Sequence, residues 1–135
     1  MKKLFIALLL STSLFAGVYT KQDRIKDMQI MAKAMSQIET GFFYNNNDII
    51  QDGALTLSDT IKRVKPPLEE AEEKDPLARY MNQKIEFTNK IVRSIDKKTE
   101  TIITRFAKGD VQASVQAYTK IMKQCIKCHH EIRQW

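Results

Sequence analysis

Both cysteines and both histidines of the chain lie within the six residues 125–130, inside the closing segment "KQCIKCHHEIRQW". Cys125, Cys128, His129 and His130 are suited to three chemistries: a redox dithiol, a metal site or a covalently attached haem. A thioredoxin-like dithiol needs a βαβ pattern around it, and no alternating strand pattern occurs in this sequence. The choice is therefore between metal, haem and a bare disulfide.

Residues 125–129 read Cys-Ile-Lys-Cys-His, which is the attachment signature of c-type haem. On a helix, residues 125 and 128 lie about one turn apart on the same side, so two thiols can bond to the two vinyl groups at one haem edge. His129 follows Cys125 by four residues, which lets its imidazole coordinate the iron from the proximal side. We therefore expect one covalent haem c on Cys125 and Cys128, with His129 as an iron ligand.

Two alternatives remain beside haem. A zinc site would need two ligands beyond Cys125 and Cys128, and on a helix the adjacent His129 and His130 point about 100° apart. A disulfide between the two cysteines would be strained inside a regular helix. We expect His130 to face solvent.

The first sixteen residues, "MKKLFIALLLSTSLFA", are predicted to be a signal peptide cleaved after Ala16, which would place the protein in the periplasm. The alternative is an uncleaved anchor, although the apolar run is short for a spanning helix of about 20 residues. Export agrees with covalent haem, because c-type haem is attached after translocation.

Removing residues 1–16 from the 135 leaves 119, enough for one domain over 17–135, with 20 basic against 16 acidic residues and a net charge of +4. The charges are scattered, and no Lys/Arg block with interleaved aromatics occurs. The sequence therefore indicates no nucleic-acid binding.

The remainder of the chain has the periodicity of an all-α protein, and we predict an antiparallel four-helix bundle with the haem motif on its last helix. The predicted helices cover about 21–43, 48–64, 76–108 and 111–132. Their boundary signals are Asp48 as an N-cap, Pro66-Pro67 as a stop, Asp75-Pro76 as a start, and Gly109-Asp110 as an end and a new cap. The acidic segment "LEEAEEK" is expected to be a solvated connection.

The residues expected to face the core recur at helical spacing. They are Ile25, Met28, Met31, Met35, Ile38, Phe42, Ile50, Ala54, Leu57, Ile61, Val64, Leu77, Met81, Ile85, Thr88, Ile91, Val92, Ile95, Ile102, Phe106, Val111, Ser114, Val115, Tyr118, Ile121, Met122, Cys125, Cys128 and Ile132.

The second axial ligand is sought on the first helix, which neighbours the fourth in an up-down-up-down bundle. His129 lies about six residues from the chain end and is level with Met28, about as far into the first helix. A thioether is a good axial ligand, and a His/Met pair raises the reduction potential of haem. We predict Met28 as the distal ligand, with core filling as its alternative, and expect Met31 and Met35 to fill the core.

With these residues in view, the chain resembles the class II c-type cytochromes, the group that includes cytochrome c′ and cytochrome c-556. That family carries its haem motif near the end of a four-helix bundle and an arginine four residues past the haem histidine, which "HHEIR" matches with Arg133. Near its start it carries an arginine four residues before the distal position, which "DRIKDM" matches with Arg24 and Met28.

The resemblance extends over the whole mature chain. It implies a propionate contact for Arg24, a contact on the proximal side of the haem for Arg133, and either a methionine ligand at Met28, as in cytochrome c-556, or an open iron, as in cytochrome c′. A surface position is the alternative for Arg24. The chain departs from the family at Ile25, where a glutamine is usual.

The leading functional hypothesis is a non-enzymatic electron carrier whose partners are other redox proteins. The alternative is a five-coordinate haem protein that binds NO or CO. A peroxidase ranks last, because no His or Arg is placed for acid–base chemistry around Met28. Phe42, Phe43 and Tyr44 are expected either to form a homodimer interface or to plug the far end of the bundle.

Overall fold

The computed structural model describes residues 19–64 and 77–133, and describes side chains over 19–64 and 84–131. Within these ranges the chain forms four helices and no strand: α1 (Lys21–Phe43), α2 (Asn47–Ile61), α3 (Leu77–Ala107) and α4 (Val111–Arg133). The all-α prediction is thus confirmed. None of the described helices combines the length and apolar character needed to cross a membrane.

Several predictions fall outside the described residues. They are the signal peptide at 1–16, the Pro66-Pro67 stop, the acidic segment at 68–74 and the Asp75-Pro76 start. The core positions predicted at Leu77, Met81 and Ile132 belong to described helices, but their side chains are outside the described set.

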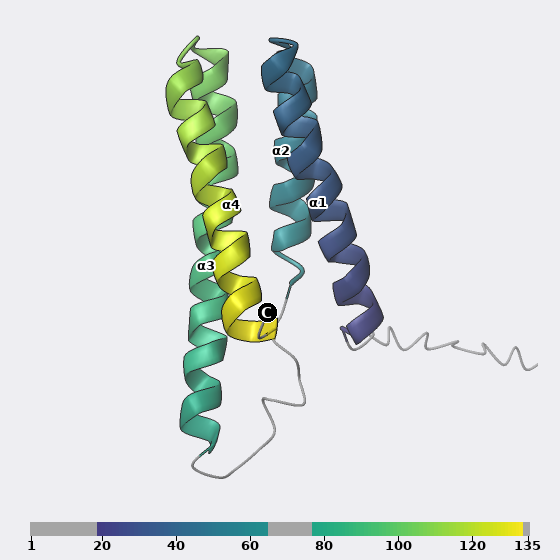
Figure 1. Cartoon of the computed structure of the whole chain (residues 1–135), viewed down its shortest axis with the longest axis vertical. Helices are drawn as coiled ribbons and strands as arrows, with labels where there is room; N and C mark the ends of the chain where they lie inside the picture. The colour runs from purple at the N-terminus through teal and green to yellow at the C-terminus, as the bar shows by residue number, and fades with distance from the viewer. Residues whose placement is uncertain (1–18, 65–76, 134–135) are drawn as a thin grey trace, which may run out of the picture.

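The helices form two side-by-side pairs, α1 with α2 and α3 with α4, and α2 also packs against α3 (Figure 1). The turns that connect the members of each pair lie at one end of the molecule. The start of α1 and the end of α4 lie toward the other end (Figure 1). This placement brings the Cys-Ile-Lys-Cys-His segment to the same end of the molecule as the first turns of α1.

The boundaries of α1 and α2 are set by side-chain caps. Thr20 and Asp23 form a reciprocal capping box at the start of α1. Asn45 adopts a positive φ of 49° in the turn after α1, and Asn46 then caps α2 by accepting hydrogen bonds of 3.0 and 3.1 Å from two backbone N–H groups of the first turn. The prediction of Asp48 as the N-cap is therefore wrong by two residues. Asp48 lies in the first turn, where a carboxylate favours the helix dipole.

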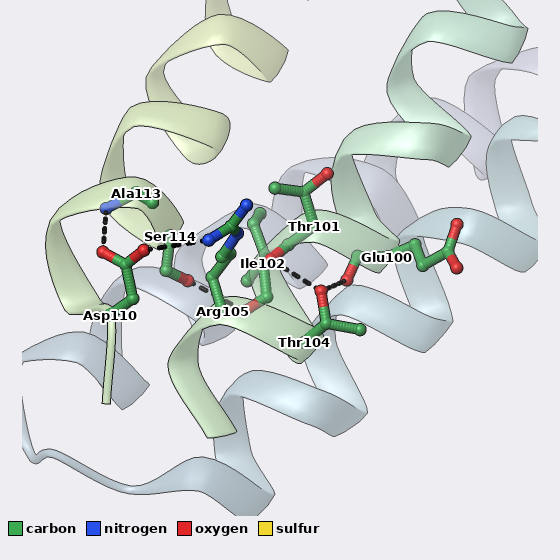
Figure 2. A network of polar contacts seen from close by, with 8 residues as sticks. All are labelled: Glu100, Thr101, Ile102, Thr104, Arg105, Asp110, Ala113 and Ser114. Carbon is green, nitrogen blue, oxygen red and sulfur yellow. Dashed lines mark hydrogen bonds and ion pairs between the residues drawn. The ribbon is translucent and has the colours of Figure 1, made fainter. Parts of the chain in front are cut away.

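The turn between α3 and α4 follows the prediction. Gly109 has a φ of 77°, the left-handed conformation that commonly ends a helix at glycine. Asp110 then caps α4 by accepting a hydrogen bond of 3.1 Å from the backbone N–H of Ala113, and it also pairs with Arg105 at 3.3 Å (Figure 2).

Polar contacts join neighbouring helices inside the bundle. The Ser114 hydroxyl is buried and donates a 2.9 Å hydrogen bond to the carbonyl of Ile102, which connects α4 to α3 (Figure 2). Asp96 of α3 accepts a 2.6 Å hydrogen bond from the Ser58 hydroxyl and lies 3.0 Å from the Lys62 ammonium. These contacts fix the register between α2, α3 and α4.

The buried apolar core agrees with the predicted faces of α2 and of the described part of α3, and with Met31, Ile38 and Ile121 on α1 and α4. Four predicted core positions are wrong: Ile25, Val111, Val115 and Met122 are exposed. On α4 the error has a simple cause, since Met122 follows buried Ile121 by one residue and so lies about 100° around the helix.

Two glycines allow α1 and α2 to approach closely. A Cβ at Gly53 would lie 2.9 Å from Cγ1 of Ile38 and 3.0 Å from the carbonyl oxygen of Ala34. A Cβ at Gly41 would lie 3.0 Å from the backbone nitrogen of Ile50. Because backbone atoms cannot move aside as a side chain can, these glycines set the spacing of the helix pair that carries Met28, Met31 and Met35.

Candidate functional site

A cavity of about 210 Å³ lies among the four helices and is lined in part by residues of the Cys-Ile-Lys-Cys-His segment. All four helices, together with Val64 just beyond α2, contribute to its wall. The described residues that line it are Met28, Met31, Ala32, Met35, Ile61, Val64, Thr88, Ile91, Val92, Ile95, Tyr118, Met122, Cys125, Cys128 and His129.

The predicted haem-binding triad lies together on the α4 wall of this cavity. Cys125, Cys128 and His129 are each half-buried, and both cysteines pack against the core. Burial raises the pKa of the Cys125 thiol to about 11, with a smaller contribution from Cys128, so this sulfur is protonated at neutral pH. The Nδ1 atom of His129 is buried.

His130 faces away from the cavity, as predicted. Its side chain is 73% exposed, and its Nδ1 atom lies 3.8 Å from a carboxylate oxygen of Glu131. Of the two adjacent histidines, only His129 lines the cavity. Among the described residues, no group of three or more His, Cys, Asp and Glu side chains is gathered so that it could hold a metal ion directly.

Three methionines form the α1 wall. Met28, Met31 and Met35 follow one another at helical spacing, and all three line the cavity. Met31 is buried in the core with 7% exposure, whereas Met28 and Met35 are half-buried and pack at the edge of the core. The cavity thus brings thioethers of α1 and the imidazole of α4 to one space, and Met28 as the coordinating residue remains a prediction.

The structure does not test the haem contacts that the resemblance implies for two arginines. Arg24 is half-buried one turn before Met28 and is not among the described residues that line the cavity. Arg133 is in the last turn of α4, four residues after His129, and its side chain is outside the described set. Both haem contacts therefore remain predictions.

The cavity wall is mostly apolar and, over its described residues, carries no Asp, Glu, Lys or Arg. The hydroxyl of Thr88 donates a 2.8 Å hydrogen bond to the carbonyl of Lys84. Burial raises the pKa of the Tyr118 phenol, and its ring meets Phe42 edge-on at a centroid distance of 5.8 Å. Such a wall suits a large apolar group with one iron-binding imidazole.

The three aromatic residues at the end of α1, Phe42, Phe43 and Tyr44, lie in different surroundings. The ring of Phe42 packs against Phe106 and Tyr118, each at a centroid distance of 5.8 Å, so it closes the cavity-distant part of the bundle. Phe43 and Tyr44 are exposed by 81% and 73%. The interpretation as a plug therefore holds for Phe42, and the homodimer interface remains a prediction for Phe43 and Tyr44.

A buried polar cluster beside the cavity was missed by the sequence reasoning. Asp27 precedes Met28, and its side chain is only 7% exposed. It accepts hydrogen bonds from the Tyr19 hydroxyl at 2.9 Å and from the Arg63 guanidinium at 2.9 and 3.3 Å. The signal was available, because Asp27 lies four residues before Met31 on the buried stripe of α1.

Asp27 changes the titration of both its partners. Burial and then the hydrogen bond to Asp27 raise the pKa of Tyr19 far above its usual value of 10.0. The hydrogen bond to Asp27 also raises the pKa of Arg63. The cluster therefore joins the segment before α1, α1 itself and the residues after α2 at the edge of the cavity.

No protein-family model, curated protein or solved structure matches the chain. The functional assignment therefore depends on the residues of this cavity and their arrangement.

Proposed function

We propose that the chain is a periplasmic monohaem c-type cytochrome of the class II kind that carries electrons, with haem c bound covalently by Cys125 and Cys128. His129 and Met28 would hold the haem iron. The observation that supports this most directly is the shared cavity, which brings the Cys-Ile-Lys-Cys-His segment of α4 together with the methionines of α1. The residues fit the group: two thiols one turn apart, one imidazole and an apolar wall.

Each residue of the triad has a distinct role in this proposal. Cys125 and Cys128 would hold the haem covalently, each through a thioether bond between its sulfur and a former vinyl group. His129 holds the iron from one side, and the apolar wall excludes water, which favours a higher reduction potential. The bound group supplies a one-electron carrier.

The proposal includes an antiparallel order of the four helices. In that order the α1–α2 pair, which packs closely at Gly41 and Gly53, and the α3–α4 pair enclose a rigid binding site. The ligands lie on facing helices, as in other cofactor-binding bundles. A rigid binding site favours electron transfer, because the iron can change its oxidation state with little rearrangement of the protein.

The test is to produce the full chain in a bacterium that attaches haem in its periplasm, and to record spectra before and after denaturation. We expect haem to remain bound after denaturation, and to be lost when Cys125 and Cys128 are both replaced by Ala. The matched pair His129→Ala and His130→Ala separates ligand from neighbour, since only the former should change the iron spectrum. Export of the chain without covalent haem would refute the proposal.

A second candidate function is the binding of NO or CO at an open iron. The uncharged, largely apolar wall of the cavity favours it, since such a site excludes water and admits diatomic gases. A six-coordinate low-spin spectrum in both oxidation states supports the electron carrier. A five-coordinate high-spin spectrum with rapid CO binding to the reduced protein supports the gas-binding alternative.

A further inference from the structure

The outer face of α4 carries an apolar strip with a basic border, beside the cavity. Met122 and Ile126 are exposed by 46% and 56%, although both are large apolar residues. Together with Lys123, Lys127 and His130 they line a surface groove, which we name the α4 patch. Exposed apolar side chains with a charged border are typical of a surface that contacts another protein.

Met122 connects this patch to the proposed haem site. Its side chain lines both the surface groove and the internal cavity that holds Cys125 and His129. A protein seated on the α4 patch would therefore lie one side chain away from the cavity.

The positive charge of the protein is concentrated on the helix pair that carries the patch. Residues 77–133 contain 12 Lys and Arg against five Asp and Glu, whereas residues 19–64 contain six of each. A second groove, between α3 and α4, is lined by Lys97, Lys98, Arg105 and Lys120. None of the described residues that line these two grooves is a carboxylate. The pair thus presents a field that attracts negative charge.

Local contacts hold part of the basic border in place. The Lys127 ammonium lies 5.3 Å from the centroid of the Phe87 ring, a cation–π contact that anchors it between α4 and α3. Glu131 is the acidic residue at the edge of the patch, where it lies 3.8 Å from His130. Lys127 is therefore held at the edge of the groove, and Lys123 is an exposed lysine that lines the same groove.

We propose that the α4 patch is the docking surface for an acidic one-electron redox protein. This inference depends on the proposed function. Negative side chains of the partner face Lys123 and Lys127, while an apolar contact covers Met122 and Ile126. One electron passes between the haem and the redox centre of the partner, one being oxidised as the other is reduced, and no covalent bond forms or breaks. Charge steers the encounter and the small apolar centre keeps the complex short-lived.

The first experiment maps the anion-attracting surface without any electron transfer. The haem-loaded protein is titrated with the paramagnetic, redox-inert anion hexacyanochromate(III), and amide signals are followed by NMR. We expect selective broadening over residues 120–127. The double variant K123E/K127E should abolish it, whereas the charge-matched control K26E/K33E, at two exposed lysines of α1, should leave it in place. Broadening centred on α1 or α2 would overturn the proposal.

The second experiment measures whether electrons use this surface. At low salt, K123E/K127E should slow oxidation of the reduced protein by the anion hexacyanoferrate(III) by about tenfold and speed oxidation by the cation tris(phenanthroline)cobalt(III). Both effects should shrink in high salt, and the control K26E/K33E, which changes the net charge by the same amount, should change the rates much less.

The outcomes separate this inference from the proposed function. Covalent haem whose electron exchange responds equally to K26E/K33E and to K123E/K127E overturns the docking surface alone, because both double variants change the net charge by the same amount and only net charge would then matter. A stable dimer in sedimentation that the substitution Ile126→Glu dissociates also overturns it, since the patch would be occupied by a second copy. Absence of covalent haem overturns both proposals.

Discussion

The Oδ1 atom of Asp27 lies 2.9 Å from Nη2 of Arg63, and this contact joins α1 to the residues after α2 next to the methionine wall of the cavity. The side chain of Asp27 is 7% exposed, whereas that of Arg63 is 51% exposed. Water can therefore solvate Arg63 if the pair is broken, but it cannot reach the buried carboxylate of Asp27.

Replacing Asp27 by Ala should lower the free energy of unfolding by about 2 kcal/mol. Breaking a fully buried pair costs more, but half of Arg63 already meets water and can be solvated when its partner is lost. Chemical denaturation of the haem-loaded protein measures the change. The control Asp52→Asn removes an exposed carboxylate of α2 and should alter stability by less than about 0.5 kcal/mol. Equal effects of the two substitutions would contradict the role given to Asp27.

The Tyr19 hydroxyl gives this cluster a signature at high pH. Its pKa is raised by burial and by Asp27 above the usual 10.0, so the folded state holds the phenol proton more tightly than the unfolded state. The stabilisation is complete below pH 10 and is lost as pH rises above it. The stability difference between the wild type and Tyr19→Phe should therefore be constant below about pH 9 and shrink above pH 10.

The wild type and the Tyr19→Phe variant are compared by denaturation at a series of pH values, with Tyr44→Phe as the control. Tyr44 is 73% exposed, so its replacement should give a difference that does not vary with pH. A Tyr19→Phe difference that grows above pH 10 would mean that the phenol is not protonated preferentially in the folded protein.

Met28 is distinguished from its neighbours by its predicted bond to iron. Met28→Leu keeps the apolar volume but removes the thioether, so the iron should become five-coordinate and its reduction potential should fall. Met31→Leu and Met35→Leu, at the other two methionines of the same wall, should leave the spectrum unchanged. Optical spectra and potentiometric titration measure the result. A spectral change in Met31→Leu or Met35→Leu instead would move the ligand to that position.

Gly53 should tolerate no side chain. In Gly53→Ala the added Cβ would lie 2.9 Å from Ile38 and 3.0 Å from the Ala34 carbonyl, so α1 and α2 must separate. We expect a net loss of about 1–2 kcal/mol, because overpacking outweighs the gain of roughly 1 kcal/mol in helix propensity. Gln51→Ala, on the exposed face of the same helix, is the control. Thermal unfolding of the two variants measures the change in stability. A raised melting temperature for Gly53→Ala would contradict the close approach of α1 and α2.

Asp96 provides the corresponding test at low pH. Burial alone would raise its pKa, but the hydrogen bonds from Ser58 and Lys62 outweigh burial and hold the pKa below 3.8. The resulting stabilisation is present above pH 3.8 and is lost as pH falls below it. The stability difference between the wild type and Ser58→Ala should therefore be largest at neutral pH and shrink in acid. Ser36→Ala, on the exposed face of α1, should show no such trend.

The sequence predicted helix boundaries correctly where neighbouring residues alone set them. Gly109 and Asp110 set the α3–α4 turn because a positive φ and a side-chain cap need only neighbouring residues. The same reasoning failed at Asp48, because two candidate caps lie two residues apart and the turn geometry selected Asn46. The reasoning also failed at Val111, Val115 and Met122, which are exposed. Periodicity locates the apolar face of a helix, but it does not show how much of that face the neighbouring helices cover.

The sequence by itself determined the helical class, the spacing that sets Cys125, Cys128 and His129 on one side of a helix, and the difference between His129 and His130. Those features follow from the 3.6-residue period of one helix. Only the tertiary structure decided that the methionines of α1 share a cavity with that triad, that Asp27 is buried against Arg63, and that Met122 borders both cavity and surface. Each of these features depends on the distance between separate helices and on their rotation relative to one another. Side-chain contacts between residues far apart in the sequence set both quantities, and no local pattern encodes them.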